Sequence, residues 1–465
     1  MSASRFCRLR RTLRALSAVG LLLVGLLAIP GTASGQVGGV AFDAAGVVRL
    51  APPLSEAELQ AVRQQLPRLS TSVARESACR VVSLRRLESA LRQYREQAGP
   101  GGWDALPADL RYLAGLNRID WVLAPAGQHD VWLVGPAGAW DADDSGSPVS
   151  RRGRRPPLEL DDLLVALRYA FPAGKTDDFI GCSIDPTPAG LAAVERLLQK
   201  HRRIDAGTAG VLARGLEQAA GAQAITLFGV PGDTRFAQKL VSADYRLKRL
   251  ALGHDPAPVP GWKNSLDLLV QRGVGRVPQQ RWWFAPASSA LRVSEARDAW
   301  RIDPQPLQIV TARRLAAGEP DAPATREARQ FAELATRLLP EVTQRVPIFA
   351  ELQNLLGLAL AAEIVREAAG RSDEAWRPEL LRDARQCPTH AVTTPRETPP
   401  LTQVRPGAKG AWICTVSGGV ELRPDTLVKE ARELAGDETL PEVADPPAST
   451  TAWWWEAIPD RGGAE

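Results

Sequence analysis

The residue types with the clearest chemical potential lie in one short segment, Gly181 to Asp185. This segment ends a predicted buried strand, and open α/β sheets bind ligands beyond such strand ends. Cys182 or Ser183 could act as a nucleophile there, with Asp185 as an acid–base group. The Gly-x-Ser-x-Gly pattern of a nucleophile elbow is incomplete, because Asp185 stands where the second glycine would be. We therefore favour a simpler interpretation, in which Asp185 caps the following turn and Cys182 is buried or disulfide-bonded.

The familiar cofactor and metal motifs are incomplete as well. Gly174-Lys175-Thr176 ends like a phosphate-binding loop, but Tyr169 stands where that loop needs a glycine. None of the four histidines has a spacing typical of metal ligands. The sequence therefore predicts neither a metal site nor a cofactor.

The cysteines permit disulfides. Cys79, Cys182, Cys387 and Cys414 follow the N-terminal segment, and an even number in an exported chain is compatible with two bridges. We expect Cys387 to pair with Cys414, because both lie in one C-terminal segment, and Cys79 then to pair with Cys182. The alternative is four buried thiols.

Residues 1–35 have the three parts of a secretory signal. Five arginines and no acidic residue precede an apolar run from Ala15 to Ile29, and Ala33-Ser34-Gly35 follows with small residues at the cleavage positions. An uncleaved membrane anchor is the alternative, but the run is shorter than the roughly 20 residues that span a bilayer. We expect an exported protein, periplasmic or extracellular, that contacts a membrane only through this segment if it is not cleaved.

The net charge depends on the same segment. The chain carries a formal charge of +4, and cleavage after Gly35 would leave a nearly neutral protein, so we expect no nucleic-acid partner. One dense basic cluster remains, Arg151-Arg152-Gly153-Arg154-Arg155. It lacks the interleaved aromatic residues on which bases stack. A solvated loop is the simpler interpretation, and contact with an anionic envelope polymer is the functional alternative.

The order strand–helix–helix–strand–helix over residues 179–252 predicts a mixed α/β fold, with α+β possible, in which helices cover a mixed sheet. A smaller strand-rich segment and a helical hairpin follow, and we expect a further β-hairpin around Gly418-Gly419.

Trp453-Trp454-Trp455 could contact a membrane or a partner, or fix the C-terminus onto the core. The expected division is a signal peptide (1–35), an N-terminal mixed α/β domain (36–252), a linker (253–262), a strand-rich segment (263–320), a helical hairpin with a small β segment (321–445) and a mobile tail (446–465).

Several phrases of the sequence together carry a resemblance to a known family. They are Val82 to Leu87, Tyr112 to Leu116, Leu160 to Arg168, Gly181 to Thr187, Asp233 to Arg249, Trp282 to Phe284 and Ile413 to Val420. Together they resemble an exported planctomycete family catalogued as domain of unknown function 1598. The resemblance implies a lineage and an exported location, but no activity and no catalytic residues.

The function predicted from these observations is a non-catalytic binding or structural role in the cell envelope, with an envelope component or another protein as partner. The alternative is a secreted hydrolase with dispersed acid–base groups, for which Asp185, Ser183 and Asp161 are the candidates. A pocket that holds Asp185 beside another titratable group would favour the hydrolase. A third hypothesis, an envelope assembly component, predicts a large exposed apolar patch near Trp453.

Overall fold

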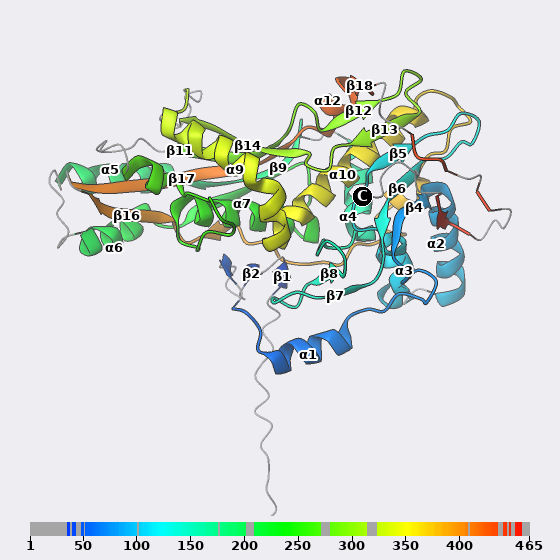
Figure 1. Ribbon diagram of the computed structural model, residues 1–465, viewed down its shortest axis with the longest axis horizontal. Coiled ribbons are helices and arrows are strands. Elements are labelled where there is room, and N and C mark those ends of the chain that lie inside the picture. Colours follow the sequence, from blue (N-terminus) through cyan, green and yellow to red (C-terminus); the bar gives the residue numbers. More distant parts are fainter. Residues whose placement is uncertain are drawn as a thin grey trace, which may run out of the picture.

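The computed structural model shows an elongated molecule built around two mixed β-sheets (Figure 1). It describes residues 35–37, 40–42, 48–50, 52–99, 102–174, 177–200, 209–270, 280–313, 323–407, 410–435, 440–443, 446–447 and 452–457. The predicted signal peptide lies outside these residues, apart from Gly35. The mixed α/β fold class is confirmed, because helices cover both sheets.

The first sheet, named here the β5 sheet, has the strand order β18-β12-β13-β5-β6-β4-β19. Neighbouring strands are antiparallel except β12 and β18, which are parallel. Its strands are β4 (Ser77–Ser83), β5 (Trp121–Leu123), β6 (Trp132–Ala137), β12 (Leu291–Val293), β13 (Ala299–Ile302), β18 (Arg432–Glu433) and β19 (Trp454–Glu456).

The second sheet, named here the β9 sheet, has the order β14-β11-β17-β9-β10-β15, and β16 pairs with β17 beyond this path. Only β11 and β17 are parallel among its described strand pairs. Its strands are β9 (Ile180–Pro186), β10 (Gln223–Phe228), β11 (Gln280–Pro286), β14 (Leu307–Arg313), β15 (Glu397–Thr398), β16 (Thr402–Gly407) and β17 (Gly410–Leu422).

Both sheets draw strands from distant parts of the sequence. Strands β11 and β14 join the β9 sheet, whereas β12 and β13, which lie between them in the chain, join the β5 sheet. One apolar core runs from Val82 and Leu133 in the β5 sheet to Ile184 and Val420 in the β9 sheet. Each sheet therefore combines strands from the N-terminal and the C-terminal half of the chain.

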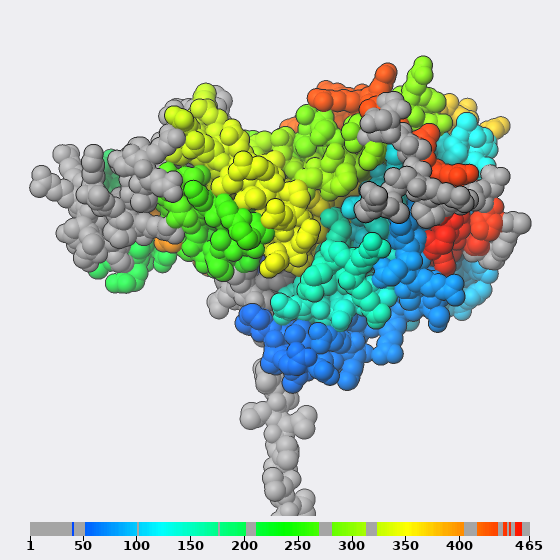
Figure 2. Space-filling view, viewed as in Figure 1, coloured from blue at the N-terminus to red at the C-terminus, as the bar shows by residue number. Residues whose placement is uncertain are grey.

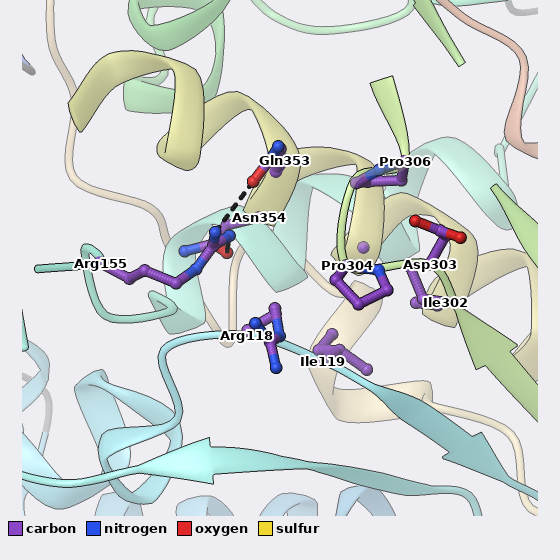
Figure 3. Close-up of a pocket in the computed structure, with 10 residues that line it drawn as sticks. Arg118, Ile119, Arg155, Ile302, Asp303, Pro304, Pro306, Gln353 and Asn354 are labelled. Atoms are coloured by element: carbon purple, nitrogen blue, oxygen red, sulfur yellow. Dashed lines mark hydrogen bonds between the residues drawn. The ribbon is translucent and has the colours of Figure 1, made fainter. Parts of the chain in front are cut away.

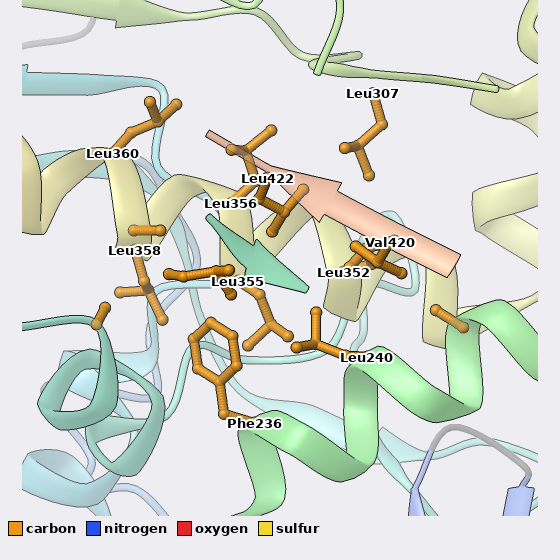
Figure 4. Packing of buried hydrophobic residues seen from close by; sticks show 14 of the residues in the cluster. Phe236, Leu240, Leu307, Leu352, Leu355, Leu356, Leu358, Leu360, Val420 and Leu422 are labelled. Atoms are coloured by element: carbon orange, nitrogen blue, oxygen red, sulfur yellow. The ribbon is translucent and has the colours of Figure 1, made fainter. Parts of the chain in front are cut away.

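Helix α10 (Pro347–Ala369) is the central element of this core. It is long and apolar enough to cross a membrane by length and composition, yet its most apolar window is completely buried inside the protein. Its leucines pack against Phe236 and Leu240 of α7 (Arg235–Leu252) and lie near Val420 of β17 (Figure 4). Helix α4 (Leu160–Ala170) also packs against α10. Burial on all sides explains the apolar composition of α10 without a membrane.

The remaining elements surround this centre. In the space-filling view, α9 (Arg326–Arg345, yellow) crosses the middle of one face (Figure 2). The helical hairpin expected around Pro347 is present as α9 and α10. The other elements are β1 (Gly35–Val37), β2 (Val40–Phe42), β3 (Val48–Leu50), β7 (Trp140–Ala142), β8 (Pro148–Ser150), α1 (Glu56–Gln65), α2 (Leu84–Ala98), α3 (Ala108–Arg111), α5 (Pro188–Lys200), α6 (Ala209–Ala220), α8 (Ser265–Val270), α11 (Glu379–Arg382), α12 (Pro424–Lys429) and the 3₁₀ turns η1 (Gly102–Ala105) and η2 (Leu113–Gly115).

Helix starts follow local capping chemistry. The side chains of Ser55, Ser83 and Thr234 accept hydrogen bonds from backbone amides of the first turns of α1, α2 and α7. Such caps satisfy amides that have no partner inside the helix. In all three helices the capping residue lies directly before the first helical residue.

The hairpin expected around Gly418-Gly419 is wrong. Both glycines lie inside the continuous strand β17, and the hairpin is formed instead by β16 and β17. A Cβ at Gly418 would lie 2.2 Å from the carbonyl oxygen of Trp282, and one at Gly419 would lie 2.2 Å from that of Cys182. These glycines therefore permit the close approach of β11 and β9 rather than a turn.

The tryptophans near the C-terminus belong to the β5 sheet. Trp454 and Trp455 lie in β19, which pairs with β4, and Trp453 and Trp455 are buried. Arg80 of β4 lies over the ring of Trp454 and forms an ion pair with Glu456. Residues 453–455 thus fix this part of the C-terminal segment onto the core, one of the roles considered from the sequence.

Candidate functional site

The basic cluster at residues 151–155 forms a tight turn after β8. The backbone amide of Ser150 donates to the carbonyl oxygen of Arg155 over 2.7 Å, and the hydroxyl of Ser150 accepts from the amide of Arg155 over 3.0 Å. Gly153 and Arg154 have positive φ angles of 82° and 49°. This left-handed backbone leaves the side chains of Arg151, Arg152 and Arg154 exposed, whereas Arg155 is partly buried.

Arg155 meets neutral oxygens instead of carboxylates. Its Nη1 donates to Oε1 of Gln353 over 2.9 Å, and its Nη2 donates to Oδ1 of Asn354 over 3.4 Å. Its Nε is buried and has no hydrogen-bond partner. No described carboxylate forms an ion pair with Arg155. Burial, and next the nearby positive charge of Arg118, lower the pKa of Arg155 to about 10.

Arg155 lines a small cavity formed by the segments at Arg118-Ile119 and at residues 302–306 and by the N-terminal half of α10 (Figure 3). The space among its lining atoms, open solvent included, is about 240 Å³. The room inside is at most that of a single water molecule. The lining residues are Arg118, Ile119, Arg155, Ile302, Asp303, Pro304, Pro306, Gln353, Asn354 and Gly357.

The other charged residues of the cavity are already matched. Arg118 pairs with Asp120 through its Nε and, over 3.0 Å, through its Nη2. Asp303 lies 3.7 Å from Arg292 and accepts a 2.8 Å hydrogen bond from the amide of Gln305. Arg155 is therefore the charged lining residue that contacts no described carboxylate, although the negative charge of Asp120 acts on it from a distance. The other walls of the cavity are largely isoleucine and proline. An anion beside Arg155 would therefore experience a stronger electric field than it would in water.

The two amides that hold Arg155 are themselves fixed. Nε2 of Gln353 donates to Oε1 of Gln305 over 2.7 Å, and Nδ2 of Asn354 donates to the carbonyl oxygen of Pro156 over 3.0 Å. Both amide oxygens are thereby oriented toward Arg155 (Figure 3). The guanidinium is held in place before any ligand arrives, which reduces the entropic cost of binding.

A second polar cluster nearby is a closed ion network. Lys239 of α7 lies 2.6 Å from Asp162 and 3.0 Å from Glu159 at the start of α4, and 3.5 Å from Glu351 of α10. Arg235 lies 3.3 Å from Glu159. Burial raises the pKa of Asp162 to about 6 in spite of Lys239. Burial would also raise the pKa of Glu159, but Arg235 and Lys239 outweigh it and lower the pKa to about 2. The network holds three carboxylates and two cations, and it joins three helices.

The structure does not assemble the three residues proposed for a hydrolase into one group. Ser183 and Asp185 lie on the same face of β9. Asp161 lies in the first turn of α4, where its Oδ2 accepts from the backbone amide of His390 over 3.0 Å and contacts Nδ1 of His390 over 2.8 Å. Nη1 of Arg111 lies 3.1 Å from Nε2 of His390. Because arginine can only donate, Nε2 accepts this bond and Nδ1 donates to Asp161.

The expected disulfides are not formed. Cys79, Cys182 and Cys387 are free thiols, and the side chain of Cys414 lies outside the described residues. Cys79 belongs to β4 of the β5 sheet and Cys182 to β9 of the other sheet, so each is held in a different layer of the molecule. Burial raises the pKa of Cys79 to about 11 and that of Cys387 to about 12.

A comparison with known families gives one match, which covers the middle of the chain. Residues 182–264 match the model of a family of proteins of unknown function, DUF1598. Searches of curated proteins and of solved structures gave no match. The DUF1598 segment contains Lys239 and Arg235 of the ion network, whereas the residues that line the cavity lie outside it.

Sequence reasoning found part of this site and missed the rest. The sequence shows the basic cluster at 151–155, but it does not indicate that Arg155 is directed into the protein. Arg118, Gln353 and Asn354 were missed. A signal for the last two was present, because adjacent amides in the long apolar run of α10 need buried hydrogen-bond partners.

Proposed function

We propose that this chain is an exported cell-envelope protein with a non-catalytic role, which binds an anionic group at Arg155. The uncompensated guanidinium of Arg155 carries the proposal. Burying a charge without a partner is costly, and a cation held at a cavity by neutral amides offers its charge to a ligand. The basic and apolar N-terminal sequence supports export, and the resemblance to an exported planctomycete family supports that lineage.

The hydrolase alternative has less support. An aspartate–histidine pair can activate a nucleophile only when the second ring nitrogen is free to accept a proton. In the pair of Asp161 and His390 that nitrogen is bonded to Arg111. The residues that line the cavity also do not include Asp185.

The assembly hypothesis has less support as well. Val211 and Leu440 are the exposed large apolar residues among the described side chains. They lie in different parts of the chain, and near the C-terminus Trp453 and Trp455 are buried and Trp454 is partly buried. A binding role at the small cavity beside Arg155 fits this surface better than a broad apolar interface.

The experiment is a titration of the full chain with two small anions, acetate and inorganic phosphate, at constant ionic strength. We expect the wild type to bind at least one of them, and Arg155→Gln to bind it at least about tenfold more weakly, since a charge-assisted hydrogen bond is worth about 1.5–3 kcal/mol. Arg337→Gln, which removes an exposed arginine of α9, is the matched control and should bind as the wild type does. Equal binding by Arg155→Gln and the wild type, or no binding by the wild type, would refute the proposal.

A further inference from the structure

The buried ion network of α4, α7 and α10 has one carboxylate more than it has cations. It holds Glu159, Asp162 and Glu351 against Arg235 and Lys239. We infer that this network binds one proton, which Asp162 and Glu351 share, and that the proton makes the packing of the three helices depend on pH. The inference concerns another part of the molecule than Arg155 and does not depend on the proposed anion site.

The contacts indicate where the proton is bound. Among the described ion pairs, Arg235 contacts only Glu159, at 3.3 Å. Lys239 lies 2.6 Å from Asp162, 3.0 Å from Glu159 and 3.5 Å from Glu351. Glu159 therefore contacts two cations, whereas Asp162 and Glu351 both depend on the same ammonium group. Two carboxylates that share one cation repel each other, and a proton on either of them removes the repulsion.

Both of these carboxyl groups also have an oxygen without a donor. The side chains of Asp162 and Glu351 are only 4% and 8% exposed. Oδ1 of Asp162 and Oε2 of Glu351 are buried, and no donor in the described part of the chain forms a hydrogen bond with them. Burying an ionised oxygen without a donor is costly. A protonated carboxyl group is neutral and supplies a donor of its own, so these surroundings favour a proton at this pair.

The titration of the three carboxyl groups supports this assignment. Burial raises the pKa of Asp162 to about 6 and also raises that of Glu351, in both cases against the effect of Lys239. For Glu159, Arg235 and Lys239 outweigh the effect of burial and lower the pKa to about 2. Glu159 therefore stays ionised, and the network releases its proton from Asp162 and Glu351 as the pH rises through about 6.

Two other titratable groups act on Glu159. Burial, and next the charge of Glu159, raise the pKa of Tyr112 to about 12, so this phenol stays neutral over the relevant range. His390, whose positive form favours the ionised form of Glu159, contacts Asp161 through Nδ1 and Arg111 through Nε2. Because these groups are common to the wild type and to variants at Glu351, their contributions cancel when the two chains are compared.

The experiment compares the full chain with Glu351→Gln, which replaces the carboxyl group by a neutral amide of similar shape. Urea denaturation gives the unfolding equilibrium constant of each chain from about pH 4.5 to about pH 7.5. Carboxyl groups of the unfolded chain titrate near pH 4, so the folded wild type holds a proton that the unfolded wild type has released. Its unfolding constant relative to that of the variant should therefore increase with pH, by up to about tenfold per pH unit.

Two further variants complete the design. Asp162→Asn neutralises the other member of the pair and should show the same dependence on pH. The matched control is Glu341→Gln, which removes an exposed carboxylate of α9. Its unfolding constant relative to the wild type should stay constant, because this side chain meets water in the folded and in the unfolded chain.

The contrary outcomes are clear. If the wild type and Glu351→Gln respond to pH in parallel, both carboxyl groups stay ionised and the inference fails. At about pH 7.5 the wild-type network carries its extra negative charge, so neutralising one carboxylate should stabilise the protein. If Glu351→Gln and Asp162→Asn both unfold more readily than the wild type at that pH, or fail to fold, the inference is overturned. None of these outcomes bears on anion binding at Arg155.

Discussion

Arg155 donates a 2.9 Å hydrogen bond to the neutral amide oxygen of Gln353, in an interior where a guanidinium ordinarily meets a carboxylate. Arg80 shows the ordinary arrangement. Its side chain is completely buried, pairs with Glu456 over 2.7 Å, and donates further bonds to backbone carbonyl oxygens. The two arginines differ in whether the protein itself neutralises them, and this difference has consequences for stability.

Replacing each arginine by glutamine should affect stability in opposite ways. Because folding lowers the pKa of Arg155 to about 10, the folded state disfavours its charge, and Arg155→Gln should unfold at the same urea concentration as the wild type or a higher one. Arg80→Gln leaves buried carbonyl oxygens unpaired and should lose about 3 kcal/mol or more of unfolding free energy. Urea denaturation followed by far-UV circular dichroism measures both. A loss above about 1 kcal/mol for Arg155→Gln would show that Arg155 serves stability rather than binding.

Lys239→Met should be strongly destabilising. Lys239 lies within 3.5 Å of three buried carboxylates, those of Asp162, Glu159 and Glu351. Its removal leaves these charges with Arg235 alone, and breaking a buried pair typically costs about 3–5 kcal/mol. The comparison is Lys429→Met, because Lys429 contacts Asp425 at the surface and exposed pairs contribute about 0–1 kcal/mol. If both variants unfold at the same denaturant concentration, the network has no role in joining the helices.

Features that depend on neighbouring residues in the chain could be predicted from the sequence. The caps at Ser83 and Thr234 directly precede α2 and α7, and a capping side chain lies within one helical turn of the amides that it bonds. The fold class followed from the order of such elements. These interactions are local, so the sequence contains all of their participants.

Features that depend on distant residues could not be predicted in this way. The pair Gly418-Gly419 predicted a turn, but the same residue type also permits close strands, and only the positions of β9 and β11 distinguish the two. The inward position of Arg155 likewise depends on Gln353, which is distant in the sequence. A basic cluster alone does not indicate which of its arginines is buried.

The stability of the protein should respond to Asp244 between pH 4 and pH 6. Burial raises the pKa of Asp244 from 3.8 to about 6, although Lys248 lies 2.9 Å away. The folded state therefore binds this proton more tightly than the unfolded state, so the contribution of Asp244 is fully present below about pH 4 and is lost as the pH rises to about 6. Measured at several pH values, the unfolding free energy of the wild type minus that of Asp244→Asn should decrease across this range. Parallel curves would show that Asp244 titrates with its ordinary pKa.

The cysteines should behave as buried thiols rather than as disulfides. Cys79, Cys182 and Cys387 are free, and burial raises the pKa of each of them. Because the thiolate is the reactive form, the native protein should react slowly with a thiol reagent at pH 8. After denaturation without a reductant, at least these three thiols should react rapidly. The full chain, purified under air without a reductant, is the proper sample, since disulfides form and persist under oxidising conditions. If two thiols or fewer react, a disulfide joins at least one of these cysteines, and the pairings expected from the sequence would become the first to test by mapping cross-linked peptides.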